Sequence, residues 1–385
     1  FFGDVPMYLE QVDLADSKPR TPKAQVVEQI LGDLEEAARH LPVAYAAEDT
    51  GRATSGAALA LKGKIELYNG MYAQAAETLK EVIDLKDENG ALRYDLYPRY
   101  RELFLPQNEN NSEVIFDIQY MKNAYSQGLS HQLYTFTYEW NSYCPTAALA
   151  ECYYTKNGYP VSWNAETQLY ESADPAFDST YPYKDRDPRL DQSIIMPGTD
   201  NGRGTVFLPS SSNHTGMKIR KWNDYTETEK NNSEHNIILI RFADVLLMRA
   251  EALVESGTFD EAEVRGLIDR VRQRPSVMMP KVEDVEGTNL DATALRAIIR
   301  HERRVEFAFE GTRISDIRRW RIGPEVMTDA YGYKYQDVRL NPPKYIPYKV
   351  DTRSFNPNRD YLWPIPQNEI NTNPFINAPN QNPGY

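Results

Sequence analysis

The last third of the chain places two predicted helical hairpins directly before an extended tail. The hairpins cover residues 240–274 and 291–320, and the tail contains the run YLWPIPQNEIN at 361–371. Proline lacks a backbone donor and asparagine favours turns, so this run suits neither a helix nor a central strand. We therefore expect the tail to be held by docking onto another part of the molecule. A helical scaffold strapped by such a tail indicates a binding platform rather than a catalytic cleft.

The composition is that of an ordinary globular protein, with 41% hydrophobic and 26% charged residues in a chain of 385. The net charge of −13 disfavours nucleic acid as a partner, because a phosphate backbone needs a basic surface. It also leaves no polybasic patch for a membrane surface. No run of 18 apolar residues is present, so the sequence predicts no membrane-spanning helix.

The two cysteines and the first residues of the chain each carry one expectation. Cys144 and Cys152 fit no zinc-binding pattern. If 145–154 is helical, the two lie about 12 Å apart, which is too far for a disulfide, so we expect free thiols. The opening FFGDVP is apolar and reads like the end of an absent helix. We expect the N-terminal part of the domain to be missing.

Apolar periodicity predicts a scaffold of antiparallel helices. Residues 23–40 carry one apolar stripe, with Thr21 as the expected N-cap and Pro22 at the first helical position. A helical hairpin follows, from 54–68 and 71–85. A third and more divergent pair is expected at 291–309 and 311–320.

Two of these hairpins share one spacing of small residues. Relative positions 0, 7 and 12 are small in both, and an aromatic residue stands two places after the central glycine: Gly63, Gly70, Ala75 and Tyr72 in the first, Ala250, Gly257, Ala262 and Phe259 in the second. Small residues at the outer positions let the two helices approach closely, and the central glycine supplies the turn. This is the logic of a tetratricopeptide repeat.

The sequence thus predicts a mostly α fold, in one domain of residues 1–385 with three parts. The helical-repeat scaffold comprises 1–113 and 237–321, and the tail 322–385 packs on it. The inserted lobe, 114–236, opens with a short strand and is rich in Gly, Pro, Asn, Ser and Tyr. A structureless loop of that length would be abnormal, so the lobe must contain short strands and helices and pack on the scaffold. Loop-rich parts on rigid scaffolds usually hold the binding site.

Charged residues at helical spacing have a functional and a structural interpretation. Glu302, Glu306 and Glu310 share one helix face and could serve a metal or acid–base chemistry. Apolar neighbours on the same helix favour instead an ion-pair network that locks the last hairpin to its surroundings. His301 lacks a second histidine at the spacing of a metal site.

The remaining motifs give no catalytic pattern. Asp185, Asp187 and Asp191 could bind an ion, but we expect instead that these three carboxylates cap and brace a turn, with Arg189 as their partner. The five histidines are scattered, and serine, histidine and aspartate show no nucleophile arrangement. The sequence predicts no catalytic residue, no metal site and no cofactor.

Aromatic residues of the lobe provide the candidate site. Sugar rings stack their C–H faces on such side chains, while Asn and Arg bind the hydroxyl groups. The rings chosen as the stacking platform are Trp140, Tyr143, Trp163, Trp222 and Tyr225. Burial in the core is the competing interpretation for each of them, since exposed aromatic rings are the rarer case.

Taken together, several motifs resemble the SusD/RagB family. They are FGDVP at 2–6, DPRL at 187–190, RFADVLLMRAEA at 241–252, RHERRVEFAFEG at 300–311 with Arg313 and Asp316, and WPIPQNEIN at 363–371 with QNPGY at 381–385. The two long motifs are specific, and the resemblance covers essentially the whole chain.

The resemblance implies a surface-exposed, substrate-binding outer-membrane lipoprotein of Bacteroidetes-type bacteria, built from tetratricopeptide-like pairs and a loop-rich lobe. Such proteins are not enzymes and deliver glycans, or in some members peptides, to a SusC-like TonB-dependent transporter. The family's export signal, lipidated cysteine and leading helices are missing here, so any membrane attachment would come from an anchor outside this chain. Binding residues vary within the family, so none transfers by motif.

Three alternatives to glycan binding remain at this point. The same architecture could bind an extended peptide, which needs pairing edges and pockets rather than flat rings. A generic tetratricopeptide scaffold would instead bind a protein in its concave helical groove. An enzyme is a more distant alternative, since no catalytic arrangement is visible.

Overall fold

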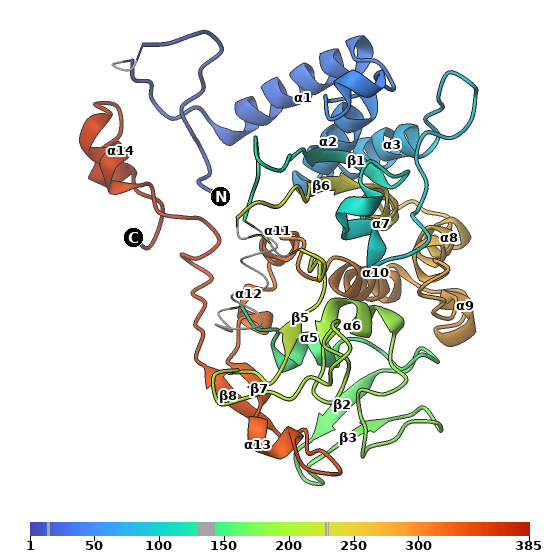
Figure 1. The fold of residues 1–385 in the computed structure, drawn as a ribbon. Helices are drawn as coiled ribbons and strands as arrows, with labels where there is room; N and C mark the ends of the chain where they lie inside the picture. The colour runs from blue at the N-terminus through green and yellow to red at the C-terminus, as the bar shows by residue number, and fades with distance from the viewer. Residues whose placement is uncertain (14–15, 129–142, 228, 230) are drawn as a thin grey trace.

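The computed structural model describes residues 1–13, 16–128, 143–227, 229 and 231–385, and helices dominate this part of the chain (Figure 1). In chain order the helices are α1 (Lys23–His40), α2 (Ser55–Tyr68), α3 (Tyr72–Ile83), α5 (Ala147–Glu151), α6 (Pro188–Ser193), α7 (Phe242–Glu255), α8 (Glu261–Arg272), α9 (Val282–Val285), α10 (Ala292–Glu306), α11 (Arg313–Arg319), α12 (Gly323–Val326), α13 (Tyr335–Val338) and α14 (Gln367–Thr372). Short 3-10 turns accompany them: η1 (Ala47–Asp49), η2 (Glu102–Phe104), η3 (Pro106–Asn108) and η5 (Ala378–Asn380).

The strands are short and pair two by two. They are β1 (Val114–Ile118), β2 (Val161–Asn164), β3 (Leu169–Ser172), β4 (Ile194–Ile195), β5 (Lys218–Ile219), β6 (Ile237–Arg241), β7 (Ala330–Tyr333) and β8 (Pro347–Asp351). The antiparallel pairs are β1–β6, β2–β3, β4–β5 and β7–β8. A mostly α fold with short strands, as predicted from the sequence, is confirmed.

The first strand of the lobe, β1, pairs with β6, the strand that directly follows the lobe. Phe116 lies opposite Ile240 and Ile118 opposite Ile237, although the two strands are far apart in the sequence. The Phe242 backbone N–H, at the start of α7, donates to the Glu113 carbonyl at 2.9 Å. This pair therefore fastens the lobe to the scaffold at the point where the chain leaves and re-enters it (Figure 1).

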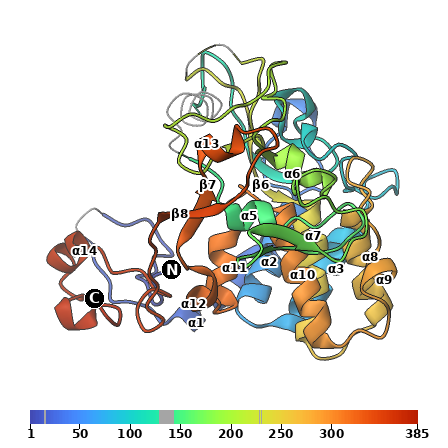
Figure 2. The same ribbon diagram turned by 90° about the horizontal axis from the view of Figure 1, so that it is seen from below.

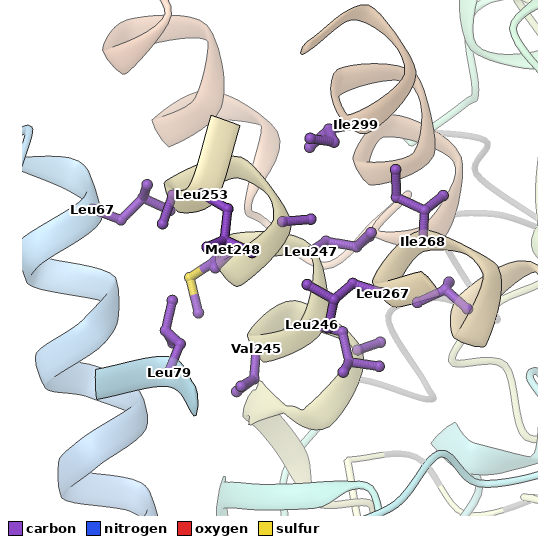
Figure 3. Close-up of a cluster of buried hydrophobic side chains, with 14 of the residues drawn as sticks. Leu67, Leu79, Val245, Leu246, Leu247, Met248, Leu253, Leu267, Ile268 and Ile299 are labelled. Atoms are coloured by element: carbon purple, nitrogen blue, oxygen red, sulfur yellow. The ribbon is translucent and has the colours of Figure 1, made fainter. Parts of the chain in front are cut away.

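Helix α7 forms the centre of the scaffold. Every residue from 242 to 254 is buried, which fits a helix that is apolar around most of its circumference. Figure 3 shows its leucines and Met248 between Leu79 of α3, Leu267 and Ile268 of α8, and Ile299 of α10. The hairpins α2–α3 and α7–α8 thus enclose one continuous core.

The repeated spacing has the structural role that the sequence predicted. Gly70 and Gly257 stand at the two turns with φ of 78° and 79°, in the left-handed region that favours glycine. A Cβ atom at Gly63 would lie 2.7 Å from the Leu79 side chain, so this glycine permits the close contact of α2 with α3. Tyr72 and Phe259 are partly buried against the same core.

A matched pair of glycine substitutions tests the turn. Gly257→Ala is expected to lower the free energy of unfolding by about 1 kcal/mol, because alanine is strained at positive φ although the space around the position is open. Gly266→Ala, inside α8 and also in open space, is expected to raise it by about 0.5–1 kcal/mol. Chemical denaturation measures both, and a stabilising Gly257→Ala would contradict the role of the turn.

The N-terminus of α1 differs from its predicted cap. Lys23–His40 is helical as predicted, but Pro22 occupies the N-cap position and Thr21 pairs with Val5 in an isolated β-bridge. The Asp4 carboxylate accepts a hydrogen bond from the Lys23 backbone N–H at 2.8 Å. Thr21 is therefore not the cap, and a residue distant in the sequence satisfies the first free N–H group.

The tail docks as the sequence required, and its partner includes the N-terminal segment. The Trp363 backbone N–H donates to the Phe1 carbonyl at 2.8 Å, and the rings of Phe1 and Trp363 stack at 4.4 Å. Arg20 donates to the Asn380 carbonyl at 2.9 Å, and Arg318 of α11 donates to the Tyr361 carbonyl at 2.9 Å. The two chain ends lie near one another in both views (Figures 1 and 2).

Both cysteines are free thiols, as expected. None of the helices in the described part of the chain combines the length and apolar composition that a membrane crossing needs.

Candidate functional site

Trp222 is buried, contrary to the expectation of an exposed stacking ring. Its exposed fraction is 7%, and its indole packs 4.7 Å from the Phe104 ring. The indole N–H donates to the Phe309 carbonyl at 3.1 Å. A ring with an apolar face against Phe104 and its polar atom satisfied inside the protein belongs to the core. The selection of Trp222 as a platform residue was wrong.

Trp163 and Tyr225 are half-buried, and each is partly covered by its neighbours. Trp163 of β2 lies opposite Tyr170 of β3, with the two rings edge to face at 5.1 Å. The Arg101 guanidinium lies 5.0 Å from the centre of the Tyr225 ring, and a Cβ at Gly202 would lie 2.1 Å from the same ring. Both side chains therefore have only part of a ring available to a ligand.

Tyr143 fits the expected platform best. Its exposed fraction is 59%, the largest among the four predicted rings that the structure describes. It precedes the half-buried Cys144 and the short helix α5. Trp140 lies outside the described residues.

An exposed ring that the sequence interpretation did not select is Tyr125, with an exposed fraction of 74%. It pairs with Met121 across a tight turn that contains Asn123 at φ 65°. The Asn123 backbone N–H donates to the Asn232 side chain at 2.8 Å, so amide groups surround this turn. The asparagine midway between Met121 and Tyr125 was the available sequence signal for such a turn.

The carboxylates of α10 form a buried ion-pair network, which confirms the structural interpretation of their spacing. Glu306 accepts from Arg189 at 2.9 Å, Arg241 at 2.8 Å and Arg274 at 2.9 Å. Glu302 accepts from Arg189 at 2.5 Å and from Arg272 at 2.9 Å. Burial would raise the pKa of Glu306, but the surrounding arginines hold it well below its usual range.

The DPRL motif connects this network to the lobe. Asp187 caps α6 by accepting from the Arg189 backbone N–H at 2.9 Å, and it also binds the Arg189 guanidinium at 2.7 Å. The predicted cap and brace are confirmed for Asp187, whereas Asp185 pairs with Lys156 at 2.9 Å. The same guanidinium reaches Glu302 and Glu306, so one side chain joins the lobe to α10. These groups are buried and bind one another, which leaves none free for acid–base chemistry.

Within the described residues, no three His, Cys, Asp or Glu side chains gather closely enough to hold a metal ion.

A scaffold of tetratricopeptide-like hairpins, carrying a loop-rich lobe with exposed tyrosines and strapped by an extended tail, defines a class of substrate-binding proteins. Residues 112–385 match the sequence model of the SusD family. The chain belongs to the SusD family.

Individual relatives agree over nearly the whole chain. A solved SusD-like carbohydrate-binding protein of Bacteroides fragilis superposes with a TM-score of 0.85 at 30% identity, covering 98% of this chain and 76% of that protein. A solved laminarin-binding SusD-like protein gives a TM-score of 0.64 at 26% identity, covering 100% and 74% of the two chains. SusD-like protein P2 of Formosa agariphila is 28% identical over 100% of this chain and 70% of its own length.

Proposed function

We propose that this protein is a non-catalytic glycan-binding protein of the cell surface. It captures an oligosaccharide and delivers it to a SusC-like TonB-dependent transporter in the outer membrane. The observation that carries the proposal is the similarity to the SusD-like carbohydrate-binding protein of Bacteroides fragilis, at a TM-score of 0.85 and 30% identity. The laminarin-binding relative supports the same class of ligand.

The physical basis for capture is an exposed aromatic ring. An aromatic face binds the C–H face of a pyranose and loses little conformational entropy, because the tyrosine side chain has few rotatable bonds. Tyr143 offers the most accessible face among the predicted rings, and Tyr225 and Trp163 can contribute edges. Trp140 remains part of the proposed platform.

Loss of the Tyr143 ring is expected to weaken glycan binding about tenfold, a loss on the order of 1–2 kcal/mol. A glycan array of neutral and acidic oligosaccharides, laminarin fragments included, first identifies a bound sugar. Titration calorimetry then compares Tyr143→Ala with the unmodified protein on that sugar.

The matched control is Tyr181→Ala, which removes another exposed tyrosine of the lobe, with an exposed fraction of 42%. It is expected to leave the affinity unchanged. Equal affinities of Tyr143→Ala and the unmodified protein would contradict the ring assignment. An array with no bound glycan, together with binding from a peptide library, would overturn the proposed ligand class.

Delivery to a transporter predicts a stable or transient complex in the outer membrane. The full-length protein, tagged and expressed in its native bacterium, should copurify a TonB-dependent transporter from detergent extracts of that membrane. Surface labelling of intact cells should reach it as well. Recovery without any TonB-dependent transporter, or labelling only after cell lysis, would contradict this part of the proposal.

A further inference from the structure

A cavity of about 300 Å³ lies where the end of α10, the start of α11, α5 and α12 meet. Within the described part of the chain its lining contains four arginines and a single aspartate, Asp316. The volume is at the lower end of the range that small-molecule sites occupy. Its walls also include apolar side chains such as Leu149, Phe309 and Met327. The cavity therefore combines an apolar surface with an excess of positive charge.

The one carboxylate in this lining is already bound. Asp316 accepts from Arg303 at 3.1 Å and from Arg319 at 2.8 Å, and Arg303 also binds Asp244 at 2.8 Å. Arg303 thus belongs to the internal network. The positive charge that remains at the cavity comes from the other three arginines of its lining, Arg304, Arg313 and Arg353.

Arg313 makes no ion pair with any carboxylate in the described part of the chain, although it is half-buried. Burial lowers the pKa of its guanidinium, and the neighbouring Arg304 lowers it further. Holding like charges together in a partly desolvated site costs free energy unless an anion compensates them. Asp316 offsets part of this cost, but its carboxylate is already paired with Arg303 and Arg319.

The two flanking arginines are held in place through backbone carbonyls. Arg304 donates to the Ala148 carbonyl at 2.7 Å, and Arg353 donates to the Thr328 carbonyl at 2.7 Å. A guanidinium has five N–H donors in a rigid plane, so one such bond orients the group and leaves donors for a ligand. Planar donors of this kind suit the oxygen atoms of a carboxylate or a sulfate.

We propose that this cavity binds the carboxylate or sulfate group of an acidic sugar residue, so that the captured oligosaccharide is an anionic one. This inference rests on the proposed glycan-binding function. Thr146 of the cavity wall is three residues from Tyr143, and an extended chain of that length spans at most about 11 Å. One oligosaccharide can therefore place a neutral ring on Tyr143 and an acidic residue in the cavity.

The overall charge of −13 makes such a local site necessary, because the molecule as a whole repels anions. Attraction is then short-ranged, and binding should weaken as salt is added. Neutral sugars should show little of this salt dependence.

Calorimetric titration with glucuronate, glucose 6-sulfate and glucose tests the proposal at low ionic strength. The two acids are expected to bind and glucose is not, and the two acids distinguish a carboxylate from a sulfate as the preferred group. Arg313→Gln should weaken binding of the preferred acid roughly tenfold. Arg39→Gln, which removes an exposed charge from α1, should leave it unchanged.

Two variants keep the outcome decisive. Arg353→Gln replaces Arg313→Gln if circular dichroism shows that the latter is unfolded. Undiminished acid binding by the folded variants, or no acid binding by the unmodified protein, overturns the anion site even when neutral glycans bind the array. Arginine-dependent acid binding together with an empty array supports the anion site and rejects the proposed glycan function.

Discussion

Replacing Glu306 by glutamine is expected to lower the free energy of unfolding by about 3–5 kcal/mol, which is the usual cost of breaking a buried ion pair by removing one partner. Glu306 is fully buried and accepts hydrogen bonds from three arginines, Arg189, Arg241 and Arg274. Glutamine keeps the size of the side chain but removes its charge. Its amide would also turn N–H donors toward guanidinium donors.

The surroundings of Glu306 explain why no neighbouring side chain can replace its negative charge. In the network around α10, five cations face five carboxylates: Arg189, Arg241, Arg272, Arg274 and Lys221 against Asp187, Glu113, Glu302, Glu306 and Glu310. Arg189, Arg241 and Arg274 each keep another carboxylate partner, but the loss of Glu306 leaves the buried network with one uncompensated positive charge. Water cannot reach these groups to compensate, so the cost is much larger than at the surface.

Urea denaturation followed by circular dichroism measures the change. Glu36→Gln on α1 is the control, because Glu36 pairs with Arg39 in a solvent-exposed position. Its effect should stay within about 0.5 kcal/mol. If Glu306→Gln cost less than about 1 kcal/mol, the network would not be the lock between the lobe and the scaffold that its contacts indicate.

The network also shows how much of the ion pairing could be predicted from the spacing of charged residues in the sequence. The positions of Glu302 and Glu306, one helical turn apart, indicated a shared face and an ion-pair role, which the structure confirms. Their partners could not be assigned in the same way. Arg189 comes from the lobe and Arg241 from the strand that re-enters the scaffold, and only the fold brings them to α10.

Local patterns predicted best where the interactions are local. The turn glycines Gly70 and Gly257 were recognisable because the backbone itself requires positive φ at those positions. The cap of α1 could not be recognised in this way, because the Lys23 N–H donates to Asp4. Only the β-bridge between Val5 and Thr21 brings Asp4 close to Lys23. Thr21 was the expected cap because it lies next to the helix, but Asp4, which is distant in the sequence, makes the capping hydrogen bond.

For the aromatic residues, the sequence could not predict which rings are exposed. Trp222 and Tyr143 stand in similar loop-rich sequence, and composition does not distinguish an inward from an outward ring. Trp222 turns inward because Phe104, from the η2 turn, provides an apolar face and Phe309 provides a carbonyl acceptor. Tyr143 has a largely exposed ring. Exposure is a property of the assembled structure, so the sequence offered candidates and could not rank them.

Acid is expected to destabilise the protein in two stages, the first of which begins below pH 6.5. Burial lowers the pKa of His235 to about 4 and of His301 to about 3, from an ordinary 6.5. A base with a lowered pKa contributes stability above its unfolded value and loses it as the pH falls toward the folded value, because the unfolded chain takes up the proton first. His301 stacks on Tyr154 at 3.9 Å, which leaves no room for a hydrated cation on that face.

Glu109 opposes this first stage. Burial raises its pKa to about 7, so the folded state holds a proton that the unfolded chain, with an ordinary 4.5, lacks. Its contribution to stability is present below pH 4.5 and is lost as the pH rises toward 7. Glu109 is only half-buried, so solvent screening reduces its share. Desolvation also raises the pKa values of Glu66, Asp117, Asp191 and Asp269, which oppose the first stage in the same sense. The two histidines have the larger shifts, so stability should still fall, by about 1 kcal/mol per pH unit between 6.5 and 4.5.

The second stage begins near pH 4.5, where the unfolded carboxylates take up protons. In the folded state Lys64 and Arg303 hold the pKa of Asp244 below its usual range in spite of burial, and arginines do the same for Glu302 and Glu306. Acids with a lowered pKa contribute stability above the unfolded value and lose it as the pH falls. Because three carboxylates join the two histidines, the slope should steepen to several kcal/mol per pH unit.

Urea denaturation at half-unit steps from pH 7.5 to 3.5 measures both slopes. His301→Phe keeps a ring against Tyr154 and removes one of the two histidine protons. Because the folded pKa of His301 is about 3, this should remove about 1.4 kcal/mol per pH unit from the slope of both stages. His40→Gln, on the exposed end of α1, should alter neither stage. A single slope throughout, or a first stage unaffected by His301→Phe, would show that the half-buried His301 does not resist protonation.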